Sequence, residues 1–569
     1  MFFSFRLNFR QLLLLLLPFL LADCTYIRRW LIPPAHTEDG ADSPQGQRTD
    51  PRTAELILVM HALPGEVTDA TALAVREGKV LARGTLDDLE AHRGTSTQVV
   101  QLPGGVAQLG LVAAHVRLEQ LAMAQDAVDL HEAKTVADVV AALQLAKPMV
   151  MAESGWLWAD RLDPALLAKL SSADLDRAMG HVAVLVTATG KPAGRVNGAM
   201  LVRLGEAGVS LEALNGLLDE RGLRLAWQNL AIARWARLKP LILGLYAEAQ
   251  KQGVTEVHAF AASLELQDAL QVLEREGRIV LRTKLFLDAE RPEGRALLEG
   301  RQTSVAANVG ESPGAQTIAQ RTQARPRREA LVQVAGVSLQ LDGTLQAGTA
   351  ALLEPYADLP QNGTLTYSDR QLEERLQLAQ KNHVQVAIQA SGDAALAQLV
   401  RVGTALGNLP QLRVDLPEML TETTLEFLHT AGATCVIQPT LTPKDLEVAR
   451  RHLGPLRMAQ FERTQALAQA CPLQIALDLT HPQPLRLLER LTHKGLNDAQ
   501  PLPLDLAWRA LATGGTTSKP TPLQVGDTAD LVVWSRDPLQ AGKTPPKLMA
   551  SIVGGTATLL IGRDLEAEK

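Results

Sequence analysis

One short apolar stretch carries the residues with the clearest capacity for chemistry. Residues 109–118 read LGLVAAHVRL, about the length of a buried strand, and the stretch ends in His115, Val116 and Arg117. Side chains two apart in a strand point the same way, so His115 and Arg117 leave its end side by side. Two histidines here would form a metal-binding pair, but arginine is permanently cationic and offers no lone pair. The stretch is therefore half of a metal-binding pair.

The composition is that of a large globular protein. The chain has 569 residues, of which 46% are hydrophobic and 21% charged, and its formal net charge is −6. Its basic residues form short clusters interrupted by acids, so no face is expected to attract a polyanion. We therefore expect no nucleic acid among its partners.

The N-terminus has the layout of an export signal. Arg6 and Arg10 precede the run LLLLLLPFLLA, which is too short to span a bilayer comfortably. Cys24 follows in a setting that resembles a bacterial lipoprotein lipobox except at Asp23, where a small residue is usual. We expect residues 1–24 to be a signal peptide with a lipobox, and Cys24 to be lipidated. The protein would then be exported and membrane-anchored in a bacterial cell envelope, facing the periplasm or the cell surface. An uncleaved anchor or a cysteine without this role are the alternatives.

Two β-rich ends flank a long middle in which strands and helices alternate. Residues 25–53 are rich in Pro, Gly and acids and are expected to form a polar tether. Short apolar runs separated by turns fill 54–107, and a similar pattern returns in 523–569. Because chain ends often lie close together, we expect these two segments to form one composite β-sandwich around the domain at 108–522.

Several strings resemble a known family. The segments ALAVREGKVLARGTLDDL, LPGGVAQLGLVAAHVRL, GDTADLVVWSRDPL and SIVGGTATL are similar to the two ends of the amidohydrolase superfamily. The string DGTLQAGTAALLEPYADLPQNGTL at 342–365 resembles the branch called amidohydrolase 3, which includes YtcJ-like proteins and N-substituted formamide deformylases. The resemblance covers about 54–564 and is weak at 289–328.

The resemblance implies an α/β fold, a (β/α)8 TIM-like barrel, and the sequence independently offers eight short apolar runs for its strands. Residues 119–252 are far more than one crossover helix needs, so an inserted α+β subdomain is expected after strand 1. Residues 289–328 lack apolar periodicity and are expected to form a flexible polar loop. The runs are Leu109–His115, Val254–Phe260, Ile279–Phe286, Leu331–Leu341, Val384–Ala390, Leu412–Leu416, Thr434–Pro439 and Leu473–Leu479.

The resemblance also implies a metal site at the strand ends, and most of its donors are missing. The family places two histidines after strand 1, a lysine on strand 4, histidines after strands 5 and 6 and an aspartate after strand 8. Only His115 and Asp478 remain as such donors. An ion pair between Arg117 and Asp478 is predicted to fill the vacated site. The substituted ligand positions are Arg117, Ser338, Gln389 and Leu416, and Lys191 stands where a motif of the inserted domain has histidine.

Other residues offer weaker alternatives. His258 and His481 could join His115 and Asp478 in a shifted site, although packed or hydrogen-bonded histidines are the commoner outcome. Lys191 and Lys284 are possible cations for an acidic ligand, but isolated lysines are usually solvated. Trp156 and Trp158 are further candidates: they either line the barrel mouth or pack the insert onto the barrel.

Two cysteines remain beyond Cys24. Cys435 and Cys471 fall near the starts of two neighbouring parallel strands of the implied barrel. Such strands lie about 4.8 Å apart, close to the Cα separation that a disulfide tolerates. A disulfide and two buried free thiols both remain open.

These observations favour a degenerate amidohydrolase that keeps the barrel and has lost its metal cofactor, without an assignable catalytic residue. Its partners would be the membrane, through the lipid anchor, and an envelope protein or a small-molecule ligand. The main alternative is an active hydrolase of non-peptide C–N bonds that uses zinc or another divalent metal, with Asp478 as the catalytic residue. A metal-free enzyme using the same pocket is the third possibility.

Overall fold

A computed structural model describes residues 52–560, apart from 64–69, 152–154, 190, 207–215, 230–234, 302–328, 410, 440–441, 481–482, 494–500, 513–522 and 541–545. The predicted signal peptide, the tether and Cys24 lie outside the described residues, as does His481. Within the described part, no helix combines the length and the apolar character needed to cross a membrane.

Eight parallel strands form the centre of the molecule, as predicted. They are hydrogen-bonded in chain order, and the last strand returns to contact the first, so the sheet forms a nearly closed TIM-like barrel. Each predicted run overlaps one strand, with ends shifted by a few residues. The strands are β6 (Leu111–Val116), β12 (Val254–Ala262), β13 (Arg282–Asp288), β14 (Val332–Gln340), β15 (Gln385–Gln389), β16 (Leu412–Asp415), β17 (Thr434–Ile437) and β18 (Leu473–Ile475).

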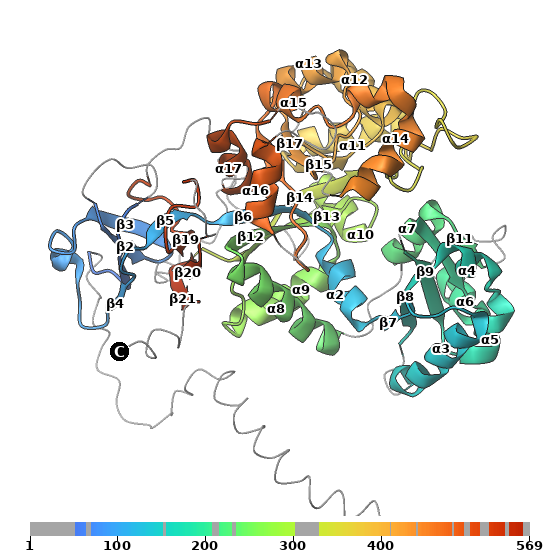
Figure 1. Cartoon of the computed structure of the whole chain (residues 1–569), viewed down its shortest axis with the longest axis horizontal. Coiled ribbons are helices and arrows are strands. Elements are labelled where there is room, and N and C mark those ends of the chain that lie inside the picture. Colours follow the sequence, from blue (N-terminus) through green and yellow to red (C-terminus); the bar gives the residue numbers. More distant parts are fainter. Residues whose placement is uncertain are drawn as a thin grey trace, which may run out of the picture. The chain divides into compact units, whose positions relative to one another are not determined.

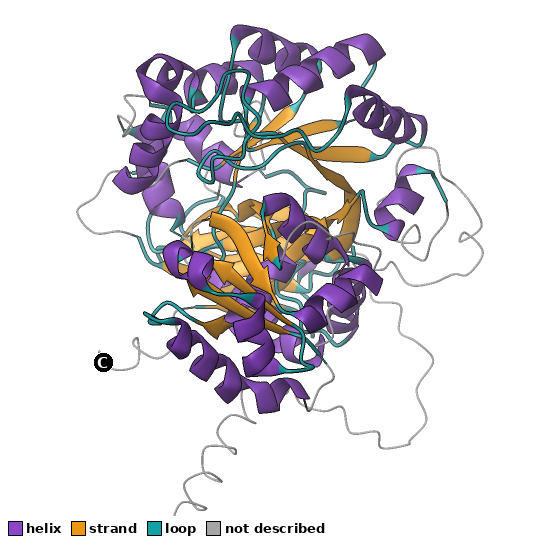
Figure 2. Ribbon diagram, turned by 90° about the vertical axis from the view of Figure 1, so that its right-hand side faces the viewer, coloured by secondary structure: helices purple, strands orange, loops and turns teal. Residues whose placement is uncertain are grey.

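Helices cover the outer face of these strands (Figure 2). In α11 (Asp369–Lys381), Leu372, Leu376 and Ala379 share one face and are buried, and a capping box between Ser368 and Gln371 begins the helix. The other helices are α2 (Leu118–Asp126), α8 (Trp235–Lys251), α9 (Leu264–Arg275), α10 (Pro292–Leu298), α12 (Asp393–Leu406), α13 (Glu422–Thr430), α14 (Pro443–Arg457), α15 (Thr464–Ala470), α16 (Pro484–Thr492) and α17 (Leu504–Ala512), with 3₁₀ turns at Glu90–His92 and Met458–Gln460.

The segment 289–328 differs from the expected polar loop in its first part. Helix α10 begins there at Pro292, and its residues Ala296, Leu297 and Leu298 are buried. A single short apolar triplet is enough to anchor one turn against a barrel, although it leaves no periodic signal in the sequence.

The two chain ends form two facing four-stranded sheets (Figure 1). Buried side chains from both, such as Leu58 and Val533, share one core. Leu109, predicted to begin the barrel, instead pairs with Leu531 in β5. Gly110 separates β5 from β6, and a Cβ there would lie 2.0 Å from Thr255 Oγ1, so a side chain would collide. The strands are β1 (Leu56–Val59), β2 (Ala72–Arg76), β3 (Lys79–Gly84) and β4 (Gln98–Gln101) in one sheet, and β5 (Val106–Leu109), β19 (Leu531–Trp534), β20 (Leu548–Val553) and β21 (Thr556–Leu559) in the other.

The insert is a mixed five-stranded sheet with its own helices, narrower than the predicted 119–252. Helices α2 and α8, at its two ends, pack into the barrel core through residues such as Ala122 and Ile242. Its elements are β7 (Val128–Asp129), α3 (Val136–Met151), β8 (Leu157–Leu162), α4 (Pro164–Lys169), α5 (Ser172–Met179), β9 (Val184–Ala188), β10 (Lys191–Val196), α6 (Gly198–Glu206), β11 (Leu217–Leu218) and α7 (Glu220–Asn229).

Candidate functional site

The carboxyl ends of the barrel strands open into a cavity of about 470 Å³. Parallel strands deliver their last residues to one edge, so side chains from distant parts of the chain meet there. The barrel contributes His115 and the four residues at substituted ligand positions, and the insert contributes Trp158 and Trp227 among others. The four are Arg117, Ser338, Gln389 and Leu416. Asp478, the other predicted remnant, does not line this cavity.

His115 is held by a carboxylate on the far side of the barrel. Its Nδ1 lies 2.6 Å from Oδ2 of Asp415, the last residue of β16. Burial lowers the pKa of His115 below its usual value despite this partner, so the imidazole is neutral at pH 7. A neutral ring beside a carboxylate must carry its proton on Nδ1 and donate it to Asp415.

Arg413 saturates the other side of Asp415. Its Nε donates to Oδ1 at 2.7 Å and its Nη2 to Oδ2 at 2.6 Å. Nη2 also donates to the carbonyl oxygen of Ala114 on β6. Burial works to raise the pKa of Asp415, but the charge of Arg413 and the hydrogen bonds from His115 and Arg413 outweigh it, so that pKa is lowered. Arg413 therefore crosses the barrel interior as one half of a buried ion pair.

Arg413 also connects Asp415 to a second pair of polar side chains, His258 and Glu256. Its Nη1 lies 2.9 Å from Nδ1 of His258, whose Nε2 lies 2.6 Å from Oε1 of Glu256. Burial lowers the pKa of His258 to about 4, so this imidazole is also neutral. It accepts from Arg413 on one nitrogen and donates to Glu256 on the other. We call His115, Asp415, Arg413, His258 and Glu256 the interior charge chain.

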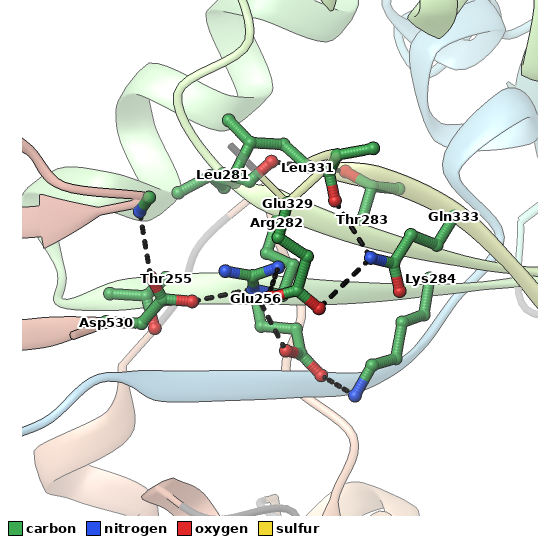
Figure 3. Close-up of polar contacts among 12 residues, drawn as sticks. Thr255, Glu256, Leu281, Arg282, Thr283, Lys284, Glu329, Leu331, Gln333 and Asp530 are labelled. Atoms are coloured by element: carbon green, nitrogen blue, oxygen red, sulfur yellow. Dashed lines mark hydrogen bonds and ion pairs between the residues drawn. The ribbon is translucent and has the colours of Figure 1, made fainter. Parts of the chain in front are cut away.

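At Glu256, the interior charge chain connects to the β-sheets formed by the two chain ends (Figure 3). Glu256 pairs with Lys284 at 2.8 Å and with Arg282 at 3.9 Å. Arg282 in turn donates to Asp530, at 2.7 Å, just before β19. From the sequence, Lys284 was a possible cation for an acidic ligand. In the structure, it is paired with Glu256 instead.

Arg117 does not form the predicted ion pair with Asp478. Its Nη2 donates to Oε1 of Gln340 at 2.9 Å and to Oε1 of Gln389 at 3.0 Å, and its guanidinium lies over the ring of Phe260, 5.4 Å from the centroid. Gln340 is held in this orientation because its Nε2 donates to the carbonyl of Asp342.

Asp478 is exposed and accepts from the backbone N–H and hydroxyl of Thr480, at 2.8 and 2.6 Å. The prediction was wrong because strand β18 ends at Ile475, three residues before Asp478, and a local turn then satisfies the carboxylate.

Ser338 and Leu416 have become parts of the framework. The hydroxyl of Ser338 accepts from the N–H of Ala261 and lies 3.2 Å from the carbonyl oxygens of Phe286 and Leu287, so it ties three neighbouring strands together. Leu416 has a φ of +57°, and it packs beside Val436 while lining the cavity. Neither side chain is placed or suited to ligate a cation.

The donor set does not fit a divalent metal. Arginine and leucine offer no lone pair, and serine and glutamine are poor zinc ligands, so His115 is the one good metal donor among these five positions, through Nε2 because its Nδ1 is hydrogen-bonded to Asp415. In the residues that the structure describes, no group of three or more His, Cys, Asp or Glu side chains is arranged to hold a metal. His258, the alternative ligand, lies within the interior charge chain, and the side chain of Lys191 lies outside the described residues.

The two tryptophans of the insert have different roles. Trp158 lines the cavity, donates from Nε1 to Thr187 at 2.7 Å, and stands edge-to-face with Trp227, their ring centroids 4.8 Å apart. Trp156 is buried in the core of the insert. Trp227, which the sequence did not single out, is thus the second aromatic wall residue.

Two cavity carboxyls have raised pKa values. Burial raises the pKa of Glu119 to about 7, against the charge of Arg291, and burial also raises that of Glu220. Oε2 of each is buried and has no hydrogen-bond partner among the described residues. Glu119 is therefore only partly ionised at neutral pH.

Cys435 and Cys471 form a disulfide in the structure, with their Cα atoms 6.3 Å apart. The bond joins the region just before β18 to β17, on the opposite edge of the barrel from the cavity.

Sequence reasoning overlooked Arg413, Asp415 and Glu256. A signal for them exists, because charged residues alternate with apolar ones in the strand segments LRVD and VTEVH, and residues two apart face the same side. This alternation places both polar side chains of each segment inside the barrel, Arg413 with Asp415 and Glu256 with His258.

The chain matches a known family in sequence. Residues 104–556 match the sequence pattern of the Amidohydrolase family, and the chain belongs to that family. It is similar in fold to crystal structures of an uncharacterized metal-dependent hydrolase from Pyrococcus horikoshii OT3 (TM-score 0.66) and of one from Pyrococcus furiosus (TM-score 0.65). Each is 20% identical and covers 85% of this chain, which in turn covers 98% and 100% of theirs. No curated protein matches the chain in sequence.

Proposed function

We propose that this chain is an amidohydrolase-family protein without metal chemistry, which binds a small molecule in the cavity at the barrel mouth. The main observation in support is the guanidinium of Arg117, which stands where the family resemblance implies a metal ligand. It is fixed by hydrogen bonds to Gln340 and to Gln389, and Gln389 occupies another of these positions. A cationic side chain fixed at this position opposes the binding of a divalent cation by direct repulsion.

The cavity itself supports a binding role. Its volume of about 470 Å³ suits a small molecule, and it combines aromatic walls with a few polar groups. Fold does not determine activity, so the chemistry of this lining carries the proposal.

We further propose that the protein is exported and anchored at Cys24, because a charged start, a short apolar run and a cysteine occur in that order. Detergent should be needed to release the full-length protein from membranes, whereas a Cys24→Ala variant should lose lipid labelling. Equal labelling of both would contradict the anchor.

The test of the metal-free assignment is elemental analysis of the full-length protein after growth with zinc and manganese. We expect far less than one metal per chain, unchanged by His115→Ala or by His429→Ala, which alters an exposed histidine elsewhere. Near-stoichiometric metal that His115→Ala removes and His429→Ala retains, together with hydrolysis of C–N bonds, would show instead an active metal-dependent hydrolase.

A further inference from the structure

Arg117 has hydrogen-bond donors that the protein does not use. Both of its hydrogen bonds leave from Nη2 and end on neutral amide oxygens, those of Gln340 and Gln389. The N–H groups on Nε and Nη1 have no acceptor among the described residues, and no described carboxylate lies within ion-pair distance of the guanidinium. A guanidinium removed from bulk water normally acquires an anionic partner.

Arg117 is accessible from the cavity and stays charged there. The residue lines the cavity, stacks on Phe260 and is only partly accessible. Burial lowers its pKa, with Asp288 and Glu220 acting in the opposite direction from a distance. Because the ordinary value is above 12, the group remains cationic at any physiological pH. The cavity thus contains a fixed positive charge with open donors.

The cavity acids do not neutralise this charge. Burial raises the pKa of Glu119 to about 7 and also raises that of Glu220, and Glu119 faces Arg291 at 3.8 Å rather than Arg117. The walls beside the charge are aromatic, formed by Phe260 and by the Trp158–Trp227 pair. The lining also contains Arg224, Arg291, Asp160 and Asp288. Arg117 differs in that no described carboxylate lies within ion-pair distance of it, so its guanidinium offers an unpaired cationic contact in a cavity with aromatic walls.

We infer that the cavity binds a small organic carboxylate, whose oxygens accept from the free N–H groups of Arg117 and whose apolar body lies along Phe260, Trp158 and Trp227. This inference rests on the proposed metal-free binding function. A singly charged carboxylate matches one unpaired guanidinium, and lining carboxylates such as Asp288 would repel a phosphate dianion about twice as strongly as a carboxylate. An anion thus occupies the place where the family resemblance implies a cation.

The test is calorimetric titration of the full-length protein with phenylacetate, phenylpropanoate and indoleacetate, each beside its neutral amide. We expect at least one carboxylate to bind, and its amide to bind at least about tenfold more weakly, because a charge-assisted hydrogen bond contributes about that factor or more. Arg117→Leu should weaken carboxylate binding about tenfold to a hundredfold and abolish the preference over the amide.

Two variants control for folding and for general charge. Arg117→Lys keeps the cation and should retain part of the preference, whereas Arg370→Leu, which removes an exposed guanidinium on α11, should leave binding unchanged. Trp158→Ala should weaken the carboxylate and its amide alike, because it removes apolar contact and no charge.

Several outcomes would overturn the inference. They are absence of binding by every carboxylate at millimolar concentration, equal binding of carboxylate and amide, an unaltered preference in Arg117→Leu, or tighter binding of inorganic phosphate. Metal analysis of the same preparation separates this failure from failure of the proposed function. A metal-free protein that prefers amides would retain the proposed function and lose the carboxylate, whereas stoichiometric bound metal would remove the basis of both.

Discussion

Arg413, in the barrel interior, and Arg117, at the barrel mouth, are partnered in opposite ways. Arg413 is 2% exposed and uses Nε, Nη1 and Nη2 to bind Asp415, His258 and the carbonyl of Ala114. Arg117 uses Nη2 alone and meets only the neutral amides of Gln340 and Gln389. The same side-chain type is thus saturated in the interior and left open at the mouth.

The difference separates a structural charge from one available to a ligand. A buried ion whose donors are all satisfied is costly to disturb, because removing it strands its partner without water or a counterion. An ion that contacts neutral groups beside a cavity strands no charge when it is removed. Stability should therefore depend on Arg413, and ligand binding on Arg117.

The largest effect should follow from Arg413→Met. Asp415 would be left buried without its cation, so we expect the free energy of unfolding to fall by about 3–5 kcal/mol. Equilibrium urea unfolding measures this loss, and Arg370→Met, on the exposed face of α11, should change it by less than about 0.5 kcal/mol. The double variant Arg413→Met with Asp415→Leu should lose less than the sum of the single variants. A loss for Arg413→Met no larger than that for Arg370→Met would break the comparison.

The next effect concerns pH and His258. Burial lowers the pKa of His258 from 6.5 to about 4, so between these values the unfolded chain binds a proton that the folded chain does not. The contribution of His258 to stability is therefore complete above pH 6.5 and declines as the pH falls to about 4, by about 3 kcal/mol in all.

Comparison with His258→Gln isolates this contribution. Glutamine can still accept from Arg413 and donate to Glu256, but it does not titrate. Urea unfolding of both proteins across this pH range should show a steeper loss for the unaltered chain. Parallel curves would mean that His258 is protonated, and would remove it from the neutral part of the interior charge chain.

The smallest effect should come from Arg117→Leu. The variant loses two hydrogen bonds to amides but also removes an incompletely solvated cation, so we expect the free energy of unfolding to change by less than about 1 kcal/mol, in either direction. The same urea unfolding measures it. A loss as large as that of Arg413→Met would assign Arg117 a structural role and weaken its assignment to a ligand.

The barrel could be predicted because each strand is specified locally. Short apolar runs such as 384–390 and 412–416 are separated by amphipathic helices, and that alternation requires no knowledge of distant contacts. Helix α10 was not predicted, because it is anchored by three apolar residues, too few to give a periodic pattern in the sequence.

The site was only partly predictable. The residue types at 117, 338, 389 and 416, where the family resemblance implies metal ligands, could be read from the sequence. The partners could not, because Arg117 meets side chains that lie 223 and 272 residues later in the chain. The predicted pairing with Asp478 failed because the position of that residue beyond the end of β18 is a local detail of a turn.

The sequence by itself determined which side chains at the barrel mouth can donate a lone pair to a metal, since that capacity belongs to the residue type. Only the tertiary structure decided which charges are satisfied. Asp415 reaches His115, 300 residues earlier in the chain, because their strands face each other across the barrel. Arg117 keeps open donors because neutral amides, and no carboxylate, come within reach where its strand ends. Hydrogen bonding and burial depend on these distances, which a linear order of residues does not contain.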